Sequence, residues 1–373
     1  MKIGIVTIYD LNNYGNRLQN YAIIKYMQQQ NIKAETLIIE QYNIVKLFKN
    51  IIRKVFKKKI YKHWNLIQEC NISNKQWDEA RIRRYYAFYD FSYKYTNIIH
   101  THYWEEFPLT IANRYDFFVA GSDQIWNSYI GQATSWEFLS FANSNKKLSW
   151  AASFGLDKIP EEKKKYYSKH LRSFKNISVR EKSGAKIIKE LIDKDAEVLI
   201  DPTLMLDADQ WREIAKKSRG RKKNEKYILK YFLGKQVDEN IDYIKTIAEK
   251  KGYEIYELMD KNQPLIYEAG PSEFIDLIDH AELICTDSFH ACVFSILFDK
   301  PFLVFDRDGN GAGMGSRIST LLLTLGLERK MPGCVDEDNI FEHDYTNTYK
   351  RLETERKKAL DFLKRSLRLE DED

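Results

Sequence analysis

The chain has 373 residues, of which 43% are hydrophobic, and its formal net charge is +5. This length exceeds the size at which a single core stops growing, so we expect two domains. The charge argues against a dedicated nucleic-acid binder, and no apolar run approaches a membrane span. Four cysteines without C-x-x-C spacing indicate free thiols rather than disulfides or a zinc site. The apolar part of the N-terminus is too short for a signal sequence, so we expect a cytoplasmic protein.

The first expected unit is a strand, a polar turn and a helix. Residues 2–8 are rich in β-branched side chains, which favours a strand. Asn13, Asn16 and Gln19 follow in the turn and at the start of the helix. The turn matches neither a dinucleotide loop nor a P-loop. The three amides either hydrogen-bond a sugar or phosphate, or they cap the helix and fill the turn.

A basic amphipathic stretch follows the second expected strand, residues 34–39. Residues 46–62 contain eight Lys or Arg and no acidic residue, with apolar residues interleaved at helical spacing. Such a segment either lies on an anionic membrane surface or packs its apolar stripe on its own domain. We interpret residues 44–100 as a helical insertion in the first domain, residues 1–205. If the segment contacts a membrane, the protein works at the inner membrane face.

Polar side chains follow the later strands of the first domain, which we expect at 115–120, 147–154, 176–179 and 197–200. Ser122 and Asp123 come directly after the first of these, and Arg180 follows the third. Ligands of parallel sheets bind beyond the carboxyl ends of the strands, so these residues are candidates for a site. The alternatives are a helix cap for Asp123 and a salt bridge to Glu181 or Asp201 for Arg180.

A polar and charged stretch at residues 206–225 indicates a domain boundary. Residues 206–340 then repeat the alternation of strands and helices, including a helix at 273–279 capped by Ser272. A glycine-rich loop at 306–320 is expected to close over a ligand, with Arg317 near its end. Residues 341–373 read as a long polar helix and an acidic tail.

The most informative stretch runs from residue 280 to 305. It reads as a strand, a polar turn, a helix and another strand, which is a parallel crossover unit. Asp287 and Ser288 lie in the turn, and His290 lies in the first turn of the helix. Helix N-termini present free N–H groups and a partial positive charge to ligands. His290 is therefore the leading candidate for a catalytic residue, and the alternative is a histidine hydrogen-bonded within the core.

Six motifs in order resemble those of the polysaccharide pyruvyl transferase family. They are NYGNRLQNYAI, FVAGSDQIWN, SWAASFG, ISVREKSG, VLIDPTLML and LICTDSFHACVFSILFDKP. The resemblance extends from about residue 1 to 327, and the last motif is the most specific. It implies an α/β fold similar to the GT-B glycosyltransferases, with two Rossmann-like domains facing each other across a cleft.

The resemblance also implies a reaction and assigns residues to it. A pyruvate unit would pass from phosphoenolpyruvate to a sugar of a cell-surface glycan or a lipid-linked precursor, giving a ketal and phosphate. His290 matches the family histidine and is assigned as general acid or phosphate ligand. Arg180 matches the family arginine and is assigned to the carboxylate or phosphate of the donor. Asp123 completes the catalytic set, and no cofactor, metal or nucleic acid is expected.

One position departs from the family pattern. Better-known members carry an arginine two residues before the histidine, and this chain has Ser288 there. Loss of a bidentate guanidinium is not conservative, so Arg317 or Lys230 must supply the charge, or the donor differs. The remaining candidates for substrate binding are Asn13, Asn16, Gln19, Ser122, Asp287 and Ser288.

Two other functions are compatible with the sequence. A GT-B-like glycosyltransferase would bind a nucleotide sugar in the C-terminal half, with residues 270–288 around the base and diphosphate. A non-catalytic module binding a glycan or an anion would keep its affinity after substitution of His290. A metal requirement would favour the glycosyltransferase, because no metal-ligand spacing is visible.

Overall fold

The computed structural model describes residues 1–40, 75–102, 108–130, 133–306, 315–330 and 339–369. The basic stretch 46–62, most of the glycine-rich loop and the last residues of the acidic tail lie outside these ranges. Cys70 and Cys334 also lie outside them. None of the helices within the described ranges is long and apolar enough to cross a membrane.

The first lobe contains a five-stranded parallel sheet in the order β3-β2-β1-β4-β5. The strands are β1 (Lys2–Val6), β2 (Lys33–Glu40), β3 (Ile98–His102), β4 (Phe117–Ala120) and β5 (Lys147–Ser149). A parallel pair, β6 (Ser178–Val179) and β7 (Glu197–Val198), extends it through isolated bridges to residues 148 and 152. Its helices are α1 (Tyr14–Gln29), α4 (Lys75–Tyr95), α5 (Pro108–Arg114), α6 (Glu161–Leu171) and α7 (Lys182–Ile192).

The second lobe contains a four-stranded parallel sheet in the order β11-β10-β8-β9. The strands are β8 (Tyr227–Tyr231), β9 (Glu254–Glu257), β10 (Leu283–Thr286) and β11 (Phe302–Val304). The helices from residue 208 onward are α8 (Ala208–Arg212), α9 (Asp238–Lys251), α10 (Pro264–Tyr267), α11 (Pro271–Asp279), α12 (Phe289–Leu297), α13 (Gly315–Leu325) and α14 (Thr346–Leu367). Short 3₁₀ helices are η1 (Ser144–Lys146), η2 (Pro202–Met205) and η3 (Glu328–Lys330). The expected pair of Rossmann-like lobes is confirmed.

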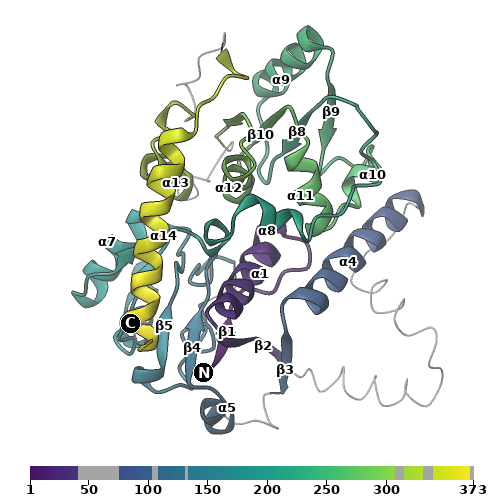
Figure 1. Cartoon of the computed structure of the whole chain (residues 1–373). Coiled ribbons are helices and arrows are strands. Elements are labelled where there is room, and N and C mark those ends of the chain that lie inside the picture. The colour runs from purple at the N-terminus through teal and green to yellow at the C-terminus, as the bar shows by residue number, and fades with distance from the viewer. Residues whose placement is uncertain (41–74, 103–107, 131–132, 307–314, 331–338, 370–373) are drawn as a thin grey trace, which may run out of the picture.

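The two lobes share one hydrophobic core. A single cluster of buried side chains joins Leu18 and Ile23 of α1 to Phe274 of α11 and Phe294 of α12. Figure 1 shows α1 between the two sheets, with α4 reaching from the first lobe toward α10. On the opposite flank, α14 runs from α13 along the first lobe (Figure 1), where it packs on η2. Contacts along α1 and on both flanks therefore hold the lobes together.

The structure corrects several local expectations. The strand expected at 147–154 ends at Ser149, because Ala151 adopts a left-handed backbone conformation with φ of 48°. Ser272 does not cap α11, because the helix already begins at Pro271, two residues before the expected start. Proline is favoured at the first helical position. Residues 98–102, placed at the end of the insertion, form edge strand β3. Arg317 lies in the first turn of α13 rather than in a loop.

Candidate active site between the two lobes

Both sheets bring their topological switch points to the same region. In the first lobe β1 lies between β2 and β4, and in the second lobe β8 lies between β9 and β10. The chain reverses its direction of winding at such points, which leaves a crevice beyond the strand ends. The loop after β1 leads to Asn16, the loop after β4 carries Ser122 and Asp123, and the turn after β10 leads to His290.

Asp201 is the centre of the cluster in this region. Its Oδ2 atom accepts hydrogen bonds from Ser122 Oγ at 2.6 Å and from Arg180 Nη1 at 2.7 Å. Its Oδ1 atom accepts from the backbone N–H of Thr203 at 3.0 Å and from the Thr203 hydroxyl at 2.7 Å. His290 Nε2, from the other lobe, lies 3.7 Å from Oδ2, which is too long for a hydrogen bond. Three segments of the first lobe and one of the second thus meet at one carboxylate.

Sequence reasoning considered Asp201 only as a salt-bridge partner for Arg180. That salt bridge exists, so the structural alternative for Arg180 is correct as a description of its contacts. Two signals were available for Asp201: its place directly after a short strand, in the sequence Asp-Pro-Thr, and its place within the motif VLIDPTLML. Asp201 also caps η2, and this local role gives no indication of its contacts with residues far away in the sequence.

Asp123 forms the second carboxylate of the cluster. Its Oδ1 atom accepts from Arg180 Nη2 at 3.3 Å, and its Oδ2 atom accepts from Asn16 Nδ2 at 3.4 Å. Arg317 Nη1 lies 3.9 Å from Oδ1. The backbone of Asp123 has a φ of 65°, a left-handed conformation that is uncommon outside glycine. Strained backbone positions of this kind persist only where the surrounding structure holds them in place, and they are common at functional sites.

The ionisation of the cluster follows from its charges. Burial alone would raise the pKa of Asp123, but the charges of Arg180, His290 and Arg317 outweigh burial and hold that pKa below its usual range. Burial likewise opposes ionisation of Asp201, and the charges of His290 and Arg180, together with the hydrogen bond from Ser122, depress its pKa far more strongly. The two carboxylates in turn raise the pKa of Arg180 against the effect of burial. The ion pairs therefore stay charged at neutral pH.

Glu181, next to Arg180, has a pKa that is shifted upward, opposite to the shifts of Asp123 and Asp201. Its Oε1 atom accepts from Ser153 Oγ at 3.0 Å and from the N–H groups of Phe154 and Gly155 at 2.9 and 3.4 Å. Its Oε2 atom is buried and has no hydrogen-bond partner in the part of the chain that the structure describes. Burial raises its pKa, and the charges of Arg180 and Arg317 offset this only in part.

The first turn of α12 is pressed against the first lobe. A Cβ at Gly15 would overlap the imidazole of His290, so α1 and α12 approach closely only because residue 15 is glycine. The ring of Phe289 stacks under the Arg180 guanidinium, with 4.3 Å between Cζ and the ring centroid. His290 is consequently only 6% exposed.

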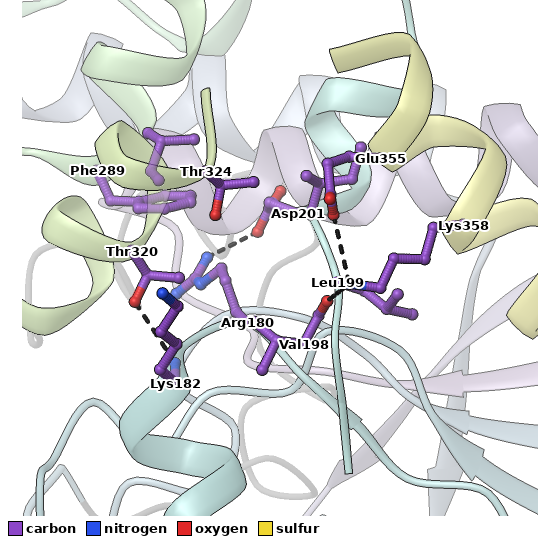
Figure 2. A pocket seen from close by; sticks show the side chains of 12 residues that line it. Arg180, Lys182, Val198, Leu199, Asp201, Phe289, Thr320, Thr324, Glu355 and Lys358 are labelled. Atoms are coloured by element: carbon purple, nitrogen blue, oxygen red, sulfur yellow. Dashed lines mark hydrogen bonds and ion pairs between the residues drawn. The ribbon is translucent and has the colours of Figure 1, made fainter. Parts of the chain in front are cut away.

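A cavity of about 260 Å³ lies beside Arg180 and Asp201. Figure 2 shows Arg180 in the middle of its wall, between Lys182 and Thr320 on one side and Asp201 on the other. Helix α14 contributes Glu355 and Lys358 from the far side (Figure 2). The rest of the lining is Val198, Leu199, Ile200, Phe289, Leu321 and Thr324. The cavity thus combines cationic and hydroxyl groups with an apolar wall.

The structure gives the other candidate residues local roles. Asn13 and Ser288 are the N-caps of α1 and α12, accepting from Asn16 N and Ala291 N. Gln19 donates to Thr7 Oγ1 at 2.7 Å and to the Asn16 carbonyl at 3.1 Å. Asp287 accepts from the N–H groups of Leu233 and Gly234, which orders the loop after β8.

Lys230 is not brought into the cluster. Its ammonium pairs with Glu257 on β9 at 2.8 Å, because its strand position directs it to that neighbour. Of the two cations expected to replace the missing arginine, only Arg317 lies beside the carboxylates. No group of three or more His, Cys, Asp or Glu side chains suited to a metal ion occurs among the described residues.

Two parallel α/β lobes with charged groups gathered at their facing strand ends define a two-lobed Rossmann-like protein. A family model described as polysaccharide pyruvyl transferase matches residues 13–309. The chain belongs to this family, which implies a transferase. A search of curated proteins finds no significant match.

Solved structures with a similar fold are distant in sequence. UDP-GlcNAc 2-epimerase from Neisseria meningitidis is 13% identical, with 98% of this chain and 100% of that chain covered and a TM-score of 0.47. A glycosyltransferase from Rickettsia africae is 14% identical, covering 99% of each chain, with a TM-score of 0.44. The E. coli ADP-heptose lps heptosyltransferase II is 8% identical, with 96% and 99% covered and a TM-score of 0.36.

Proposed function

We propose that the protein transfers the pyruvate unit of phosphoenolpyruvate to a sugar of a cell-surface glycan or of its lipid-linked precursor. The family supports pyruvyl transfer. The observation that carries the choice of donor is the meeting of Arg180, Arg317 and His290 at two carboxylates, next to a cavity lined by further cations. A small molecule with a carboxylate and a phosphate suits such a group of cations.

The chemistry defines what the site must supply. The methylene carbon of phosphoenolpyruvate takes up a proton, which leaves an oxocarbenium-like centre at the neighbouring carbon. A sugar hydroxyl attacks that carbon and loses its proton, the bond to the phosphate oxygen breaks, and a second hydroxyl closes the ketal. The site therefore needs a proton donor, cations for the carboxylate and phosphate, and a route for two hydroxyl protons.

Arg180 is assigned to bind the donor anion. Its two Nη atoms are held by Asp201 and Asp123, which fixes the plane of the guanidinium. Its Nε atom is buried and has no hydrogen-bond partner among the described residues, so one N–H remains to bind a ligand. Lys182 lines the same cavity and adds positive charge where a phosphate would sit. Lys358 also lines it, but its ammonium is paired with Glu355 at 3.6 Å and donates to the Val198 carbonyl at 2.8 Å.

His290 is assigned as general acid or phosphate ligand, because an imidazole changes its charge near neutral pH. Arg317 is assigned the second cation role, since Ser288 carries no charge and Lys230 is paired elsewhere. The depressed pKa of Asp123 makes it a weak proton acceptor. We therefore assign Asp123 to orient Arg180 and Asn16 rather than to act as the base.

Phosphate release from phosphoenolpyruvate, measured with a panel of sugar acceptors, tests the proposal. Wild type should release phosphate only with a suitable acceptor, and His290→Ala should lose this activity while keeping its thermal stability. The matched control is His280→Ala, because His280 lies half-exposed at the end of α11, where its ring pairs with Asp276 of the same helix. This control should be as active as wild type.

Two outcomes would overturn the proposal in different directions. Release of phosphate by neither protein, together with tight binding of a uridine or cytidine nucleotide, would indicate the glycosyltransferase alternative. Glycan binding that is unchanged in His290→Ala, with no turnover of any donor, would indicate a non-catalytic binding module.

A further inference from the structure

Arg84 is a buried cation between the two lobes that the proposed reaction does not use. It lies on α4, and only 1% of its surface is exposed. Its oxygen acceptors are neutral amide, hydroxyl and backbone carbonyl groups, and no ion pair between described residues includes it. Burial of an uncompensated charge is unfavourable, so its surroundings must supply other interactions.

Those interactions come from both lobes. In the first lobe, Arg84 donates from Nε to Asn12 Oδ1 at 2.8 Å and from Nη1 to the Tyr14 hydroxyl. In the second lobe, Nη1 donates to the carbonyls of Tyr267 at 2.9 Å and Ala269 at 3.3 Å. The rings of Tyr14, Phe88 and Tyr267 lie 4.5 to 5.1 Å from the guanidinium carbon. One side chain therefore connects the start of α1 and the loop before it to the end of α10 and the segment that follows it.

Tyr14 extends this connection. Its hydroxyl donates to the Ala269 carbonyl at 2.8 Å, so it accepts from Arg84 and donates to the second lobe at once. Its ring stacks on Phe274 of α11 with 4.4 Å between centroids. Burial raises the pKa of Tyr14 to about 12, so the hydroxyl keeps its proton at neutral pH.

The two residues that follow Tyr14 belong to the candidate active site. Gly15 packs against the imidazole of His290, and Asn16 donates to Asp123. Both of these contacts depend on where the first turn of α1 lies relative to α12. That turn is anchored to the second lobe by Tyr14, and Tyr14 is anchored by Arg84.

We propose that Arg84 is a positioning residue, which holds the first turn of α1 on the second lobe so that Gly15 stays against His290. Arg84 does not touch the reacting groups, and its effect on catalysis rests on the proposed function. A hydrophobic residue would fill the same space without burying a charge. It would not reach Asn12, Tyr14 and two backbone carbonyls in fixed geometry, as the rigid guanidinium fork does.

The test compares Arg84→Met and Arg84→Lys with Arg83→Met. Arg83 is adjacent on α4 and also reaches the second lobe, but its side chain is 41% exposed. Its partner Glu268 keeps a second ion pair with Arg219 at 2.9 Å after the substitution. Arg83→Met therefore removes an interlobe charge from the same helix and should leave activity and α1 unchanged.

Two readouts separate positioning from a general structural role. Hydrogen exchange of residues 12–20, measured without substrate, should be at least tenfold faster in Arg84→Met, with the strands of both sheets unchanged. In phosphate release, kcat should fall at least tenfold while KM for phosphoenolpyruvate changes less than threefold. Arg84→Lys should recover part of the protection from exchange and part of kcat, because lysine keeps the charge and some of the hydrogen bonds.

Wild-type exchange of residues 12–20 in Arg84→Met would overturn the proposal, as would faster exchange with an unchanged kcat. If Arg84→Met does not fold, Tyr14→Phe takes its place, since it removes only the hydroxyl that links Arg84 to Ala269. If wild type does not turn over phosphoenolpyruvate, the proposed function fails, and the exchange measurement still decides whether Arg84 holds the turn.

Discussion

Gly15 of the first lobe and His290 of the second are packed so closely that a Cβ on Gly15 would overlap the imidazole ring. The residues are far apart in the chain and lie in helices of different lobes, α1 and α12, yet their contact sets where the candidate catalytic group lies. The position of His290 therefore depends on the smallest side chain in the first turn of α1.

Gly15→Ala should displace the imidazole or push α1 away from α12, because no space exists for the added methyl group. Misplacement of a catalytic group by about 1 Å can lower the rate on the order of 100-fold. We expect kcat/KM for phosphoenolpyruvate to fall by about that factor, measured as phosphate release.

Gly252→Ala is the control for loss of stability alone. Gly252 ends α9 with a φ of 64°, and no atom would contact its Cβ. The left-handed backbone should cost the variant about 1 kcal/mol of unfolding free energy without an effect on rate. A fully active Gly15→Ala would show that the tight contact does not matter for the reaction.

Lys182→Ala should weaken donor binding. Lys182 lines the cavity beside Arg180, and its side chain is exposed, so its removal should not affect folding. We expect KM for phosphoenolpyruvate to rise about 3- to 10-fold with little change in kcat, because one phosphate contact to a cation contributes about 1 kcal/mol.

Lys186→Ala is the matched control on the same helix. Lys186 is 71% exposed, and among the described residues its ion pair is with Glu190, one turn further along α7. The same rise in KM in both variants would indicate a general effect of surface charge. An unchanged KM in Lys182→Ala would remove the cavity from the proposed donor site.

Asp201→Asn should be most destabilising at neutral pH. The pKa of Asp201 is lowered by folding, so its ionisation stabilises the folded protein above the unfolded pKa of about 4, and this stabilisation is lost as the pH falls. The variant also leaves Arg180 with one carboxylate fewer in a buried site. We expect a loss of about 3 to 5 kcal/mol from pH 7 down to about pH 4, measured by urea unfolding, and a smaller loss as the pH falls below 4. A loss that grows below pH 4 would contradict this assignment.

Glu181→Gln should show the opposite pH dependence. The pKa of Glu181 is raised by folding, so wild type loses stability as the pH rises above the unfolded pKa of about 4. Glutamine does not ionise and can still accept the hydrogen bonds made to Oε1. The difference in unfolding free energy between the variant and wild type should therefore move in favour of the variant from pH 4 to pH 7.

Glu190→Gln serves as the control for Glu181→Gln. Glu190 is exposed on α7, the helix that Glu181 precedes, and its ion pair among the described residues is with Lys186. Its substitution should not reproduce the change between pH 4 and pH 7 that is expected for Glu181→Gln. The assignment is wrong if Glu181→Gln becomes less favourable as the pH rises.

Cys285 and Cys292 should not react with thiol reagents in the folded protein. Both thiols are fully buried, in β10 and α12, and burial raises the pKa of each. The thiolate is the reactive form, so both access and ionisation oppose labelling. Mass spectrometry of labelled peptides should find these two cysteines modified only in urea. Equal labelling rates with and without urea would show that the core opens readily.

Local patterns in the sequence were enough to predict both Rossmann-like lobes. Short β-branched runs and helical stripes depend on neighbouring residues only, so β1 was predicted close to its observed bounds, and a strand, a turn and a helix were predicted in the stretch that forms β10 and α12. The rule that ligands bind beyond strand ends also selected Asn16, Asp123, Arg180 and His290, and the structure brings these four together.

The tertiary structure decided which groups these residues meet. Asp201 has a local role as the cap of η2, and nothing in its neighbourhood shows that Arg180, Ser122 and His290 converge on it. Arg84 is one of several arginines on a helix, and only the packing of α4 across both lobes buries it. Lys230 and Arg317 were equivalent as cations in the sequence. The register of β8 beside β9 pairs one with Glu257, and the start of α13 places the other by Asp123. Contacts between residues so far apart in the chain depend on how the two lobes pack, and short-range patterns carry no information about that packing.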